Sequence, residues 1–314
     1  MAITAAQVKE LRDITGAGMM ACKKALAATE GDMDKAVEFL REQGLAGAEK
    51  KAGRIAAEGV SFAKVSEDMH TGVVVEVNAE TDFVAKNAKF QAYVDQVCDQ
   101  ALTTTAADID AFLAEKWNLD ENRTVAEQLS EEISIIGENM HIRRFHKLVE
   151  NEGLVSAYIH AGGRIGVILQ VKSDVVNDAV VEMAKNIAMQ IAALNPKYTT
   201  RAEVDQEYLA HETAILTEAA KNEKPNAPEK VLNGMVQGRL NKELKEICLV
   251  DQTYVRAEDG KQTVQQYVDS VAKAQGAKIS LVTFVRYETG EGLEKKSEDF
   301  AAEVAAQQAA AKKN

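Results

Sequence analysis

The hydrophobic positions at the start of the chain predict three short helices within residues 1–52. Glycines from Gly16 separate the first helix from a second one over 19–29, and we expect Gly44 to end the third. A unit of about 50 residues buries little surface alone, so we expect it to dock on another surface. The residues predicted to cap these helices or to face inward are Thr4, Val8, Leu11, Asp32, Ala36, Val37 and Leu40.

An internal repeat becomes visible when the sequence is shifted by 94 residues. The segment GVVVEV at 72–77 then aligns with GVILQV at 166–171. In both copies, alternating apolar residues predict two strands joined by a turn, and a helical pattern follows. The sequence therefore predicts a strand hairpin plus a helix used twice, with helices near 107–117 and 124–136 between the copies.

The second copy continues into two helices that we expect to form an antiparallel coiled coil over about 198–243. Apolar positions between 204 and 215 follow the 4-3-4 spacing of a narrow seam. One narrow seam per helix suits a pair of helices rather than a core, so we expect the hairpin to project from the body. The residues that we expect this seam to bury are Val204, Ile215, Val231 and Met235.

Beyond the hairpin, the pattern predicts strands near 247–250 and 279–287, with a helix at about 264–275 between them. The glycines at 290 and 292 interrupt the pattern, and a final helix is expected from about Ser297. Strands and helices in these proportions predict an α+β protein.

The composition restricts the class of protein. A formal net charge of -12 disfavours non-specific binding to nucleic acid or to anionic membranes. No apolar run approaches the ~18 residues of a membrane span, and the start lacks the apolar region of a signal peptide. Three widely spaced cysteines without a CxxC pair support neither a disulfide framework nor a zinc site. We expect a cytoplasmic protein with no direct contact to nucleic acid or membrane.

Motifs that carry enzymatic chemistry are absent from the sequence, including phosphate loops, GxGxxG, HExxH and GxSxG. His141 and His146 stand five residues apart on a predicted strand, which places them on opposite faces and disfavours a shared metal. Cys22 beside Lys23 is a candidate reactive thiol, although a small packing residue is the favoured interpretation. We therefore predict no active site, cofactor or metal site.

The stretch NAETDFVAKN at 78–87 is a polar turn directly after a buried strand, and it carries an acid next to a large apolar ring. The shift of 94 residues sets TDFV against Val-Val-Asn-Asp at 175–178, so the fold is repeated here but the Asp-Phe pair is not. A residue that the fold requires tends to occur in both copies, which favours a functional role. The alternative is a helix cap with the ring tucked beneath it as a staple. The candidate residues are Thr81, Asp82, Phe83 and Val84.

Several motifs resemble the bacterial elongation factor Ts family, whose members exchange the nucleotide of the GTPase elongation factor Tu. They are LRDITGAGMMACKKAL, TDFVAKN, IGENMHIRR, YIHAGGRIGV and RYETGEGLEKKSEDFAAEVAA, in this order. The resemblance covers almost the whole chain. It departs at Ala21, where the family often has an acid, and at Ala79, where it often has a cysteine.

The resemblance implies a three-helix module similar to ubiquitin-associated domains, two α/β core subdomains, an inserted antiparallel coiled coil and a C-terminal helix. The implied divisions are 1–54, 55–150, 151–289 with the coiled coil inside it, and 290–314. It implies a guanine nucleotide exchange factor that promotes GDP release from elongation factor Tu. The alternative function is a non-catalytic scaffold that binds helices or ubiquitin-like folds through 1–52, and self-association stays open.

The resemblance also implies roles for particular residues. The segment from Thr81 to Val84 is expected to contact the GTPase near its bound magnesium, with Asp82 and Phe83 entering it. His160 is expected to contact another part of the partner, although a solvated histidine at a hairpin turn is the simpler alternative. The residues expected to contact a helix of the GTPase domain are Arg12, Met19, Met20 and Lys23.

Overall fold

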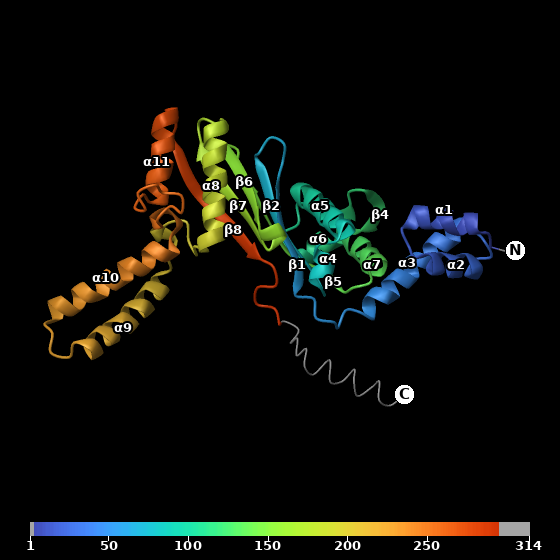
Figure 1. The fold of residues 1–314 in the computed structure, drawn as a ribbon, viewed down its shortest axis with the longest axis horizontal. Helices are drawn as coiled ribbons and strands as arrows, with labels where there is room; N and C mark the ends of the chain where they lie inside the picture. Colours follow the sequence, from blue (N-terminus) through green and yellow to red (C-terminus); the bar gives the residue numbers. More distant parts are fainter. Residues whose placement is uncertain (1–2, 295–314) are drawn as a thin grey trace.

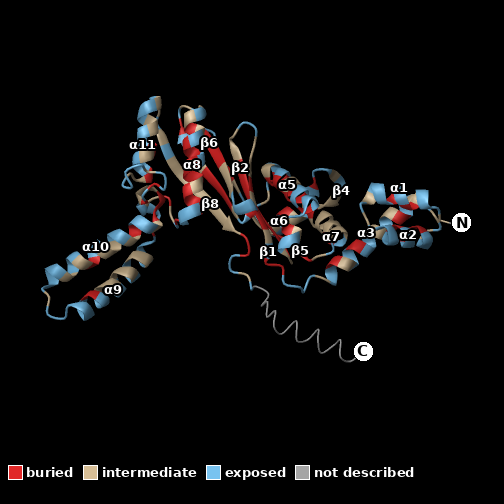
Figure 2. Ribbon diagram, viewed as in Figure 1, coloured by how far each residue is buried: buried red, intermediate tan, exposed pale blue. Residues whose placement is uncertain are grey.

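The computed structural model describes residues 3–294 and contains both helices and antiparallel sheets, which confirms the α+β class. The final helix predicted from Ser297 lies outside these described residues. Buried residues concentrate in the sheets and in the helices that cover them (Figure 2). At either end of the molecule, small helical units extend from this central part (Figure 1).

Three helices form the N-terminal bundle: α1 (Ala5–Thr15), α2 (Met19–Ala28) and α3 (Met33–Glu49). Thr4 caps α1 through a capping box, as predicted. The prediction that Gly44 ends the third helix is wrong, because α3 continues for more than a turn beyond it. Gly44 faces Ser134 of a helix in the central part, on which α3 packs. A glycine inside a helix is about 1 kcal/mol less favourable than an alanine, and this packing outweighs that cost.

Two three-stranded sheets pack face to face in the centre of the molecule. The first has the order β1 (Glu58–Val65), β2 (Thr71–Ala79) and β5 (Met140–Val149). The second has the order β6 (Gly153–His160), β7 (Ile165–Ser173) and β8 (Ile279–Glu288). Helix α5 (Ala88–Thr103) covers the first sheet and α8 (Asp178–Leu194) covers the second. The buried residues between the sheets are Ala63, Val74, Leu148, Val155 and Ile168.

The predicted repeat is confirmed by the strand registers. Gly59 pairs with Asn78 in the first copy, and Gly153 pairs with Lys172 in the second, which are the same positions after the shift of 94 residues. A Cβ atom on either glycine would lie 2.1 Å from a carbonyl oxygen of the neighbouring strand. Both copies therefore need glycine here, because the two backbones approach too closely for any side chain.

The first copy contains additional elements between its helix and its third strand. They are α6 (Ile109–Ala114), β3 (Lys116–Trp117), β4 (Asp120–Thr124) and α7 (Val125–Ile136). The helix predicted at 107–117 is thus shorter than expected, and the hairpin of β3 and β4 was not predicted. These two strands are short, and Asp120 to Arg123 lack the alternation of apolar residues that marks a strand.

Helices α9 (Gln206–Glu223) and α10 (Glu229–Ile247) form a hairpin that projects from the body, as predicted (Figure 1). Val204 is buried at its base and Met235 is half-buried. The predicted burial of Ile215 and Val231 is wrong, because both are exposed. Inside the hairpin the buried positions are Ala220, Val236 and Leu244, which are offset from the predicted seam.

The strand predicted at 247–250 is wrong, whereas the later predictions hold. Residues Leu249–Asp251 form a 3-10 turn directly after α10, and Leu249 is completely buried. The short apolar run at 247–250 is therefore apolar because it is buried, and not because it forms a strand. Helix α11 (Val264–Gln275) matches its prediction and packs on α8, and β8 matches the strand predicted at 279–287.

Candidate functional site

The chain leaves β2 at Ala79 and enters a single helical turn, α4 (Asp82–Ala85). Thr81 caps this turn, since its Oγ1 accepts a hydrogen bond from the backbone N of Val84 at 3.3 Å. Val84 is partly buried and Ala85 is buried against the core beneath the first sheet. These apolar contacts and the cap explain why four residues form a helical turn at this position.

Phe83 points away from this core, and its side chain is 82% exposed. The alternative in which Phe83 tucks beneath the helix as a staple is therefore wrong, although the Thr81 cap of that alternative is present. An aromatic ring of this size is normally covered when the fold uses it. The structure thus separates the two parts of the motif: Thr81, Val84 and Ala85 hold the turn, and Phe83 is presented to the outside.

Asp82 forms an ion pair with Lys86, whose Nζ donates to the carboxylate at 2.6 Å. Both side chains are largely exposed. The hydrogen bond from Lys86 holds the pKa of Asp82 below its usual value. The turn therefore carries a charged pair next to Phe83, and sequence reasoning had singled out only the acid.

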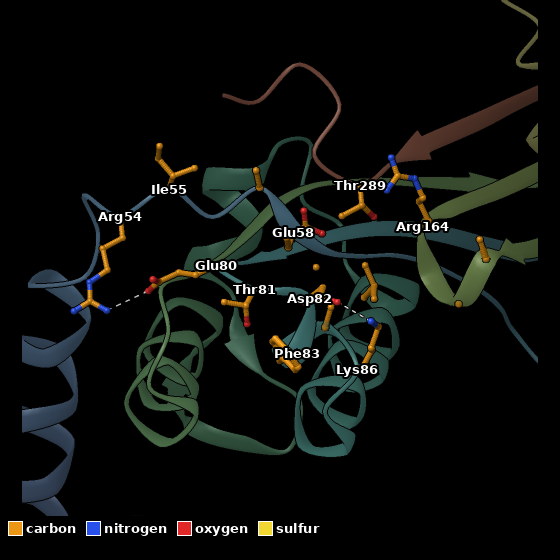
Figure 3. A pocket seen from close by; sticks show the side chains of 16 residues that line it. Arg54, Ile55, Glu58, Glu80, Thr81, Asp82, Phe83, Lys86, Arg164 and Thr289 are labelled. Carbon is orange, nitrogen blue, oxygen red and sulfur yellow. Dashed lines mark hydrogen bonds and ion pairs between the residues drawn. The ribbon is translucent and has the colours of Figure 1, made fainter. Parts of the chain in front are cut away.

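The α4 turn forms one wall of an open groove of about 1140 Å³ that runs between the two copies. The opposite side is the turn that joins β6 to β7, which contributes Gly162 and Arg164 (Figure 3). His160 ends β6 just before that turn, is exposed, and pairs through Nδ1 with the hydroxyl of Tyr158 at 3.1 Å. The structure therefore brings the turn after His160 to the same groove as Asp82 and Phe83.

The four candidates in the N-terminal bundle are exposed, and none of them lines this groove. Their helices α1 and α2 lie at the end of the molecule away from α4 (Figure 1). Met19 and Met20 begin α2 and are 58% and 77% exposed. Ile14 near the end of α1 is 61% exposed and was not predicted as a surface residue. Its place three residues after the buried Leu11 has the spacing of a core position, so no sequence signal distinguishes it. The remaining two candidates, Arg12 and Lys23, are exposed on the same two helices.

The thiol and histidine candidates are also placed by the structure. Cys22 is completely buried in the core of the N-terminal bundle, so the packing interpretation is confirmed over the reactive thiol. His141 and His146 both lie on β5, but the prediction that they occupy opposite faces is wrong. A bulge between them pairs His141 with Asn78 and His146 with Val74, which lie on the same face of β2. Within residues 3–294, no group of three or more histidine, cysteine or acidic side chains is arranged to hold a metal ion.

Comparison with known proteins places this geometry in a family. A family model described as Elongation factor TS matches residues 80–291. The chain is 50% identical to elongation factor Ts of Clostridioides difficile (strain 630), over 97% of this chain and 98% of that protein. It is 49% identical to elongation factor Ts of Clostridium novyi (strain NT), over 96% and 97% of the two chains. The chain belongs to the elongation factor Ts family.

Sequence reasoning missed the residues that support the α4 turn in this elongation factor Ts family member. Glu138 and Asn139 follow α7 and contact residues 80–81 through hydrogen bonds. Arg54, in the linker after α3, forms an ion pair with Glu80 (Figure 3). Glu138 and Asn139 belong to the IGENMHIRR motif that contributed to the family resemblance, but their contacts depend on the tertiary structure.

In the described part of the chain, no helix is both long and apolar enough to cross a membrane.

Proposed function

We propose that the chain is a guanine nucleotide exchange factor that binds elongation factor Tu with GDP and promotes GDP release, which allows GTP to load. Membership of the elongation factor Ts family supports this partner. The observation that carries the proposal is the 82% exposure of Phe83 on a helical turn that Thr81 caps. The protein acts by binding and has no chemical active site or cofactor of its own.

Phe83 acts as a wedge in this mechanism. A GTPase holds GDP through backbone amides around the phosphates and through magnesium, which requires near-octahedral oxygen ligands at about 2.1 Å. A site with such strict geometry loses affinity when its walls move. Burial of the Phe83 ring in a pocket of the partner supplies roughly 2–3 kcal/mol for this movement. Each tenfold loss of GDP affinity requires about 1.4 kcal/mol, so the ring alone is insufficient.

Asp82 brings a carboxylate toward the magnesium and phosphates of the partner, where it disturbs the water and carboxylate ligands of the metal. Lys86 accompanies it, because the two side chains form an ion pair in the free protein. The ammonium group offsets the charge repulsion between Asp82 and the phosphates. Thr81 and Val84 hold the turn in place, as their contacts in the structure indicate.

A second contact surface keeps the partner in the distorted state. It consists of Arg12, Met19, Met20 and Lys23, which we assign to a helix of the GTPase domain. His160, beside the groove, contacts another part of the partner. Binding of this protein and binding of nucleotide oppose each other. GDP or GTP therefore weakens the complex by the same factor by which this protein weakens nucleotide binding. The exchange factor is therefore released once GTP has bound.

The domain organisation follows from the same proposal. We assign residues 1–54 to partner docking, 55–150 and 151–289 to the two core subdomains, and 290–314 to a C-terminal module. The first of these adopts a fold like ubiquitin-associated domains. The projecting hairpin is the inserted coiled coil, which serves self-association or secondary contacts and not exchange. The protein works in the cytoplasm without direct contact to nucleic acid or membrane.

Release of fluorescent GDP from purified elongation factor Tu tests the proposal. Small amounts of the wild-type chain should accelerate release, and Phe83→Ala should slow the accelerated rate at least tenfold without a loss of stability. Leu119→Ala is the matched control, because Leu119 is an apolar residue with 67% exposure outside the groove. A wild-type chain that binds the GTPase without accelerating GDP release would support the scaffold alternative instead.

A further inference from the structure

The α4 turn is held by a contact that links it to the chain after α7. Glu138 is half-buried, and its two carboxylate oxygens accept hydrogen bonds from Thr81, from the backbone N at 3.0 Å and from Oγ1 at 2.7 Å. Gly137 ends α7 in the left-handed conformation, with φ of 92°, and so turns Glu138 toward Thr81. The same Thr81 hydroxyl caps α4 by accepting from Val84.

This arrangement fixes the hydroxyl hydrogen of Thr81. A hydroxyl that donates to a carboxylate points its lone pairs elsewhere, and here one of them faces the backbone N of Val84. Hydrogen bonds to a charged acceptor are stronger than those between neutral groups. Since α4 has only four residues, it depends on this cap much more than a long helix does. Glu138 therefore orients the cap of the turn that carries Phe83.

A neighbouring contact belongs to the repeated fold and provides a comparison. The backbone N of Asn139 donates to Glu80 at 2.6 Å, and the backbone N of Lys278 donates to Asp174 at 2.7 Å. Glu80 and Asp174 are equivalent after the shift of 94 residues, and Asn139 and Lys278 each precede the third strand of their sheet. Both copies therefore use this contact to join the second strand to the third.

The contact of Glu138 with Thr81, in contrast, has no counterpart in the second copy. The strand registers place Ala277 at its equivalent position in the second copy, where Asn177 caps α8 directly. The repeated fold is thus built once with the carboxylate and once without it. The carboxylate occurs only in the copy that carries Asp82 and Phe83. This pattern is the one expected of a residue that serves the turn and not the sheet.

We propose that Glu138 is a positioning residue for nucleotide exchange: it orients Thr81 and so holds Phe83 in the direction that enters the GTPase. This inference rests on the proposed exchange function. Loss of the carboxylate frees the Thr81 hydroxyl and lets the α4 turn sample other conformations. The wedge then reaches the partner correctly in only a fraction of encounters, while the contact surface on the N-terminal bundle is unchanged.

The experiment measures fluorescent GDP release from elongation factor Tu at increasing concentrations of wild type, Glu138→Ala and Glu138→Gln. We expect Glu138→Ala to lower the maximal release rate about tenfold, with a smaller change in the half-saturating concentration. Glu138→Gln keeps one acceptor oxygen and should be intermediate. Asp174→Ala removes the contact of the second copy that corresponds to the one between Glu80 and Asn139. It should lower stability in urea without lowering the maximal rate.

A double-mutant cycle with Phe83→Ala decides whether Glu138 acts through the wedge. If it does, Glu138→Ala should change the rate less than twofold when Phe83 is already absent. An undiminished effect in that background, or full activity of Glu138→Ala, would overturn the proposal. Amide hydrogen exchange of residues 81–86 provides a readout independent of the GTPase, and it should be faster in Glu138→Ala. Unchanged protection would also overturn the proposal, whereas a wild type that fails to release GDP would instead refute the exchange function.

Discussion

The carboxylate of Glu76, completely buried in β2, accepts a hydrogen bond from Nε of Arg144 in β5 at 2.6 Å. It also accepts from Arg143 at 3.0 Å and from the backbone N of Gly290 at 2.8 Å. Gly290 follows β8 of the second sheet. One buried carboxylate therefore joins the first sheet to the segment that leaves the second sheet, and Thr289 of that segment lines the groove.

Glu76→Ala should lower the free energy of unfolding by about 3–5 kcal/mol, because removal of one partner leaves buried donors and two arginines without their acceptor. Urea unfolding at neutral pH measures this change. Gln170→Ala is the matched control, since Gln170 is the equivalent residue of the second copy and is a neutral, partly exposed side chain. If Glu76→Ala lowers the free energy of unfolding no more than Gln170→Ala does, water replaces the carboxylate as the hydrogen-bond partner of the two arginines.

Much of the fold could be predicted because its signals are local. The capping box at Thr4 and the strand alternation at 72–77 need no distant partner to be recognised. The errors occur where distant packing decides. Helix α3 continues through Gly44 because it packs on α7, and Ile215 is exposed because the hairpin helices meet on a different face from the predicted one.

The candidate site shows the same division. Asp82 and Phe83 could be singled out as candidates because the internal repeat supplies a second copy that lacks them, which is a comparison within one chain. Lys86 and Glu138 were missed for a different reason. Their side chains resemble ordinary solvated charges in the sequence, and only the folded chain brings them to Asp82 at 2.6 Å and to Thr81 at 2.7 Å.

Glu132 on α7 should make stability depend on pH. Its burial raises its pKa above the usual glutamate value. A carboxyl whose pKa is higher in the folded state binds protons more tightly there, so its unfavourable effect grows as the pH rises through that pKa. Glu132→Gln should therefore increase stability at about pH 7.5 and change it little at about pH 4. Equal effects at both values, measured by urea unfolding, would show that its charge is not responsible.

Met20 should contribute to partner binding and not to the fold, because its side chain is 77% exposed at the start of α2. If the partner covers this side chain, Met20→Ala should weaken binding to nucleotide-free elongation factor Tu about tenfold. Calorimetric titration measures the affinity, and the melting temperature should stay unchanged. The same affinity for Met20→Ala and for the control Leu119→Ala would remove Met20 from the contact surface.

The distal part of the hairpin should be dispensable for exchange. None of the residues that line the groove belongs to α9 or α10, and the hairpin projects on the side of the molecule away from α4 (Figure 1). Replacement of 214–237 by a short glycine and serine linker keeps the buried base at Val204, Leu244 and Cys248. We expect GDP release within about twofold of wild type. A folded variant without any exchange activity would contradict this assignment.

The role of Asp82 depends on magnesium if the mechanism proposed above is correct. Chelation of magnesium removes the ion that joins the phosphates to the GTPase, so spontaneous GDP release rises and the acceleration by this protein shrinks. Asp82→Ala should then lose a modest part of the acceleration when magnesium is present and little when it is absent. Stopped-flow release of fluorescent GDP at several free magnesium concentrations measures both conditions.

Lys86→Met provides the companion variant for this last test, because it removes the ammonium and leaves the Asp82 carboxylate without its partner in the free protein. The carboxylate stays ionised near neutral pH, since the ordinary aspartate pKa is about 3.9 even without Lys86. If Asp82 acts on the metal shell, Lys86→Met should alter exchange mainly with magnesium present, as Asp82→Ala does. A defect of equal size with and without magnesium in both variants would assign the charged pair to deformation of the phosphate loop, with Phe83, and would leave the exchange function standing.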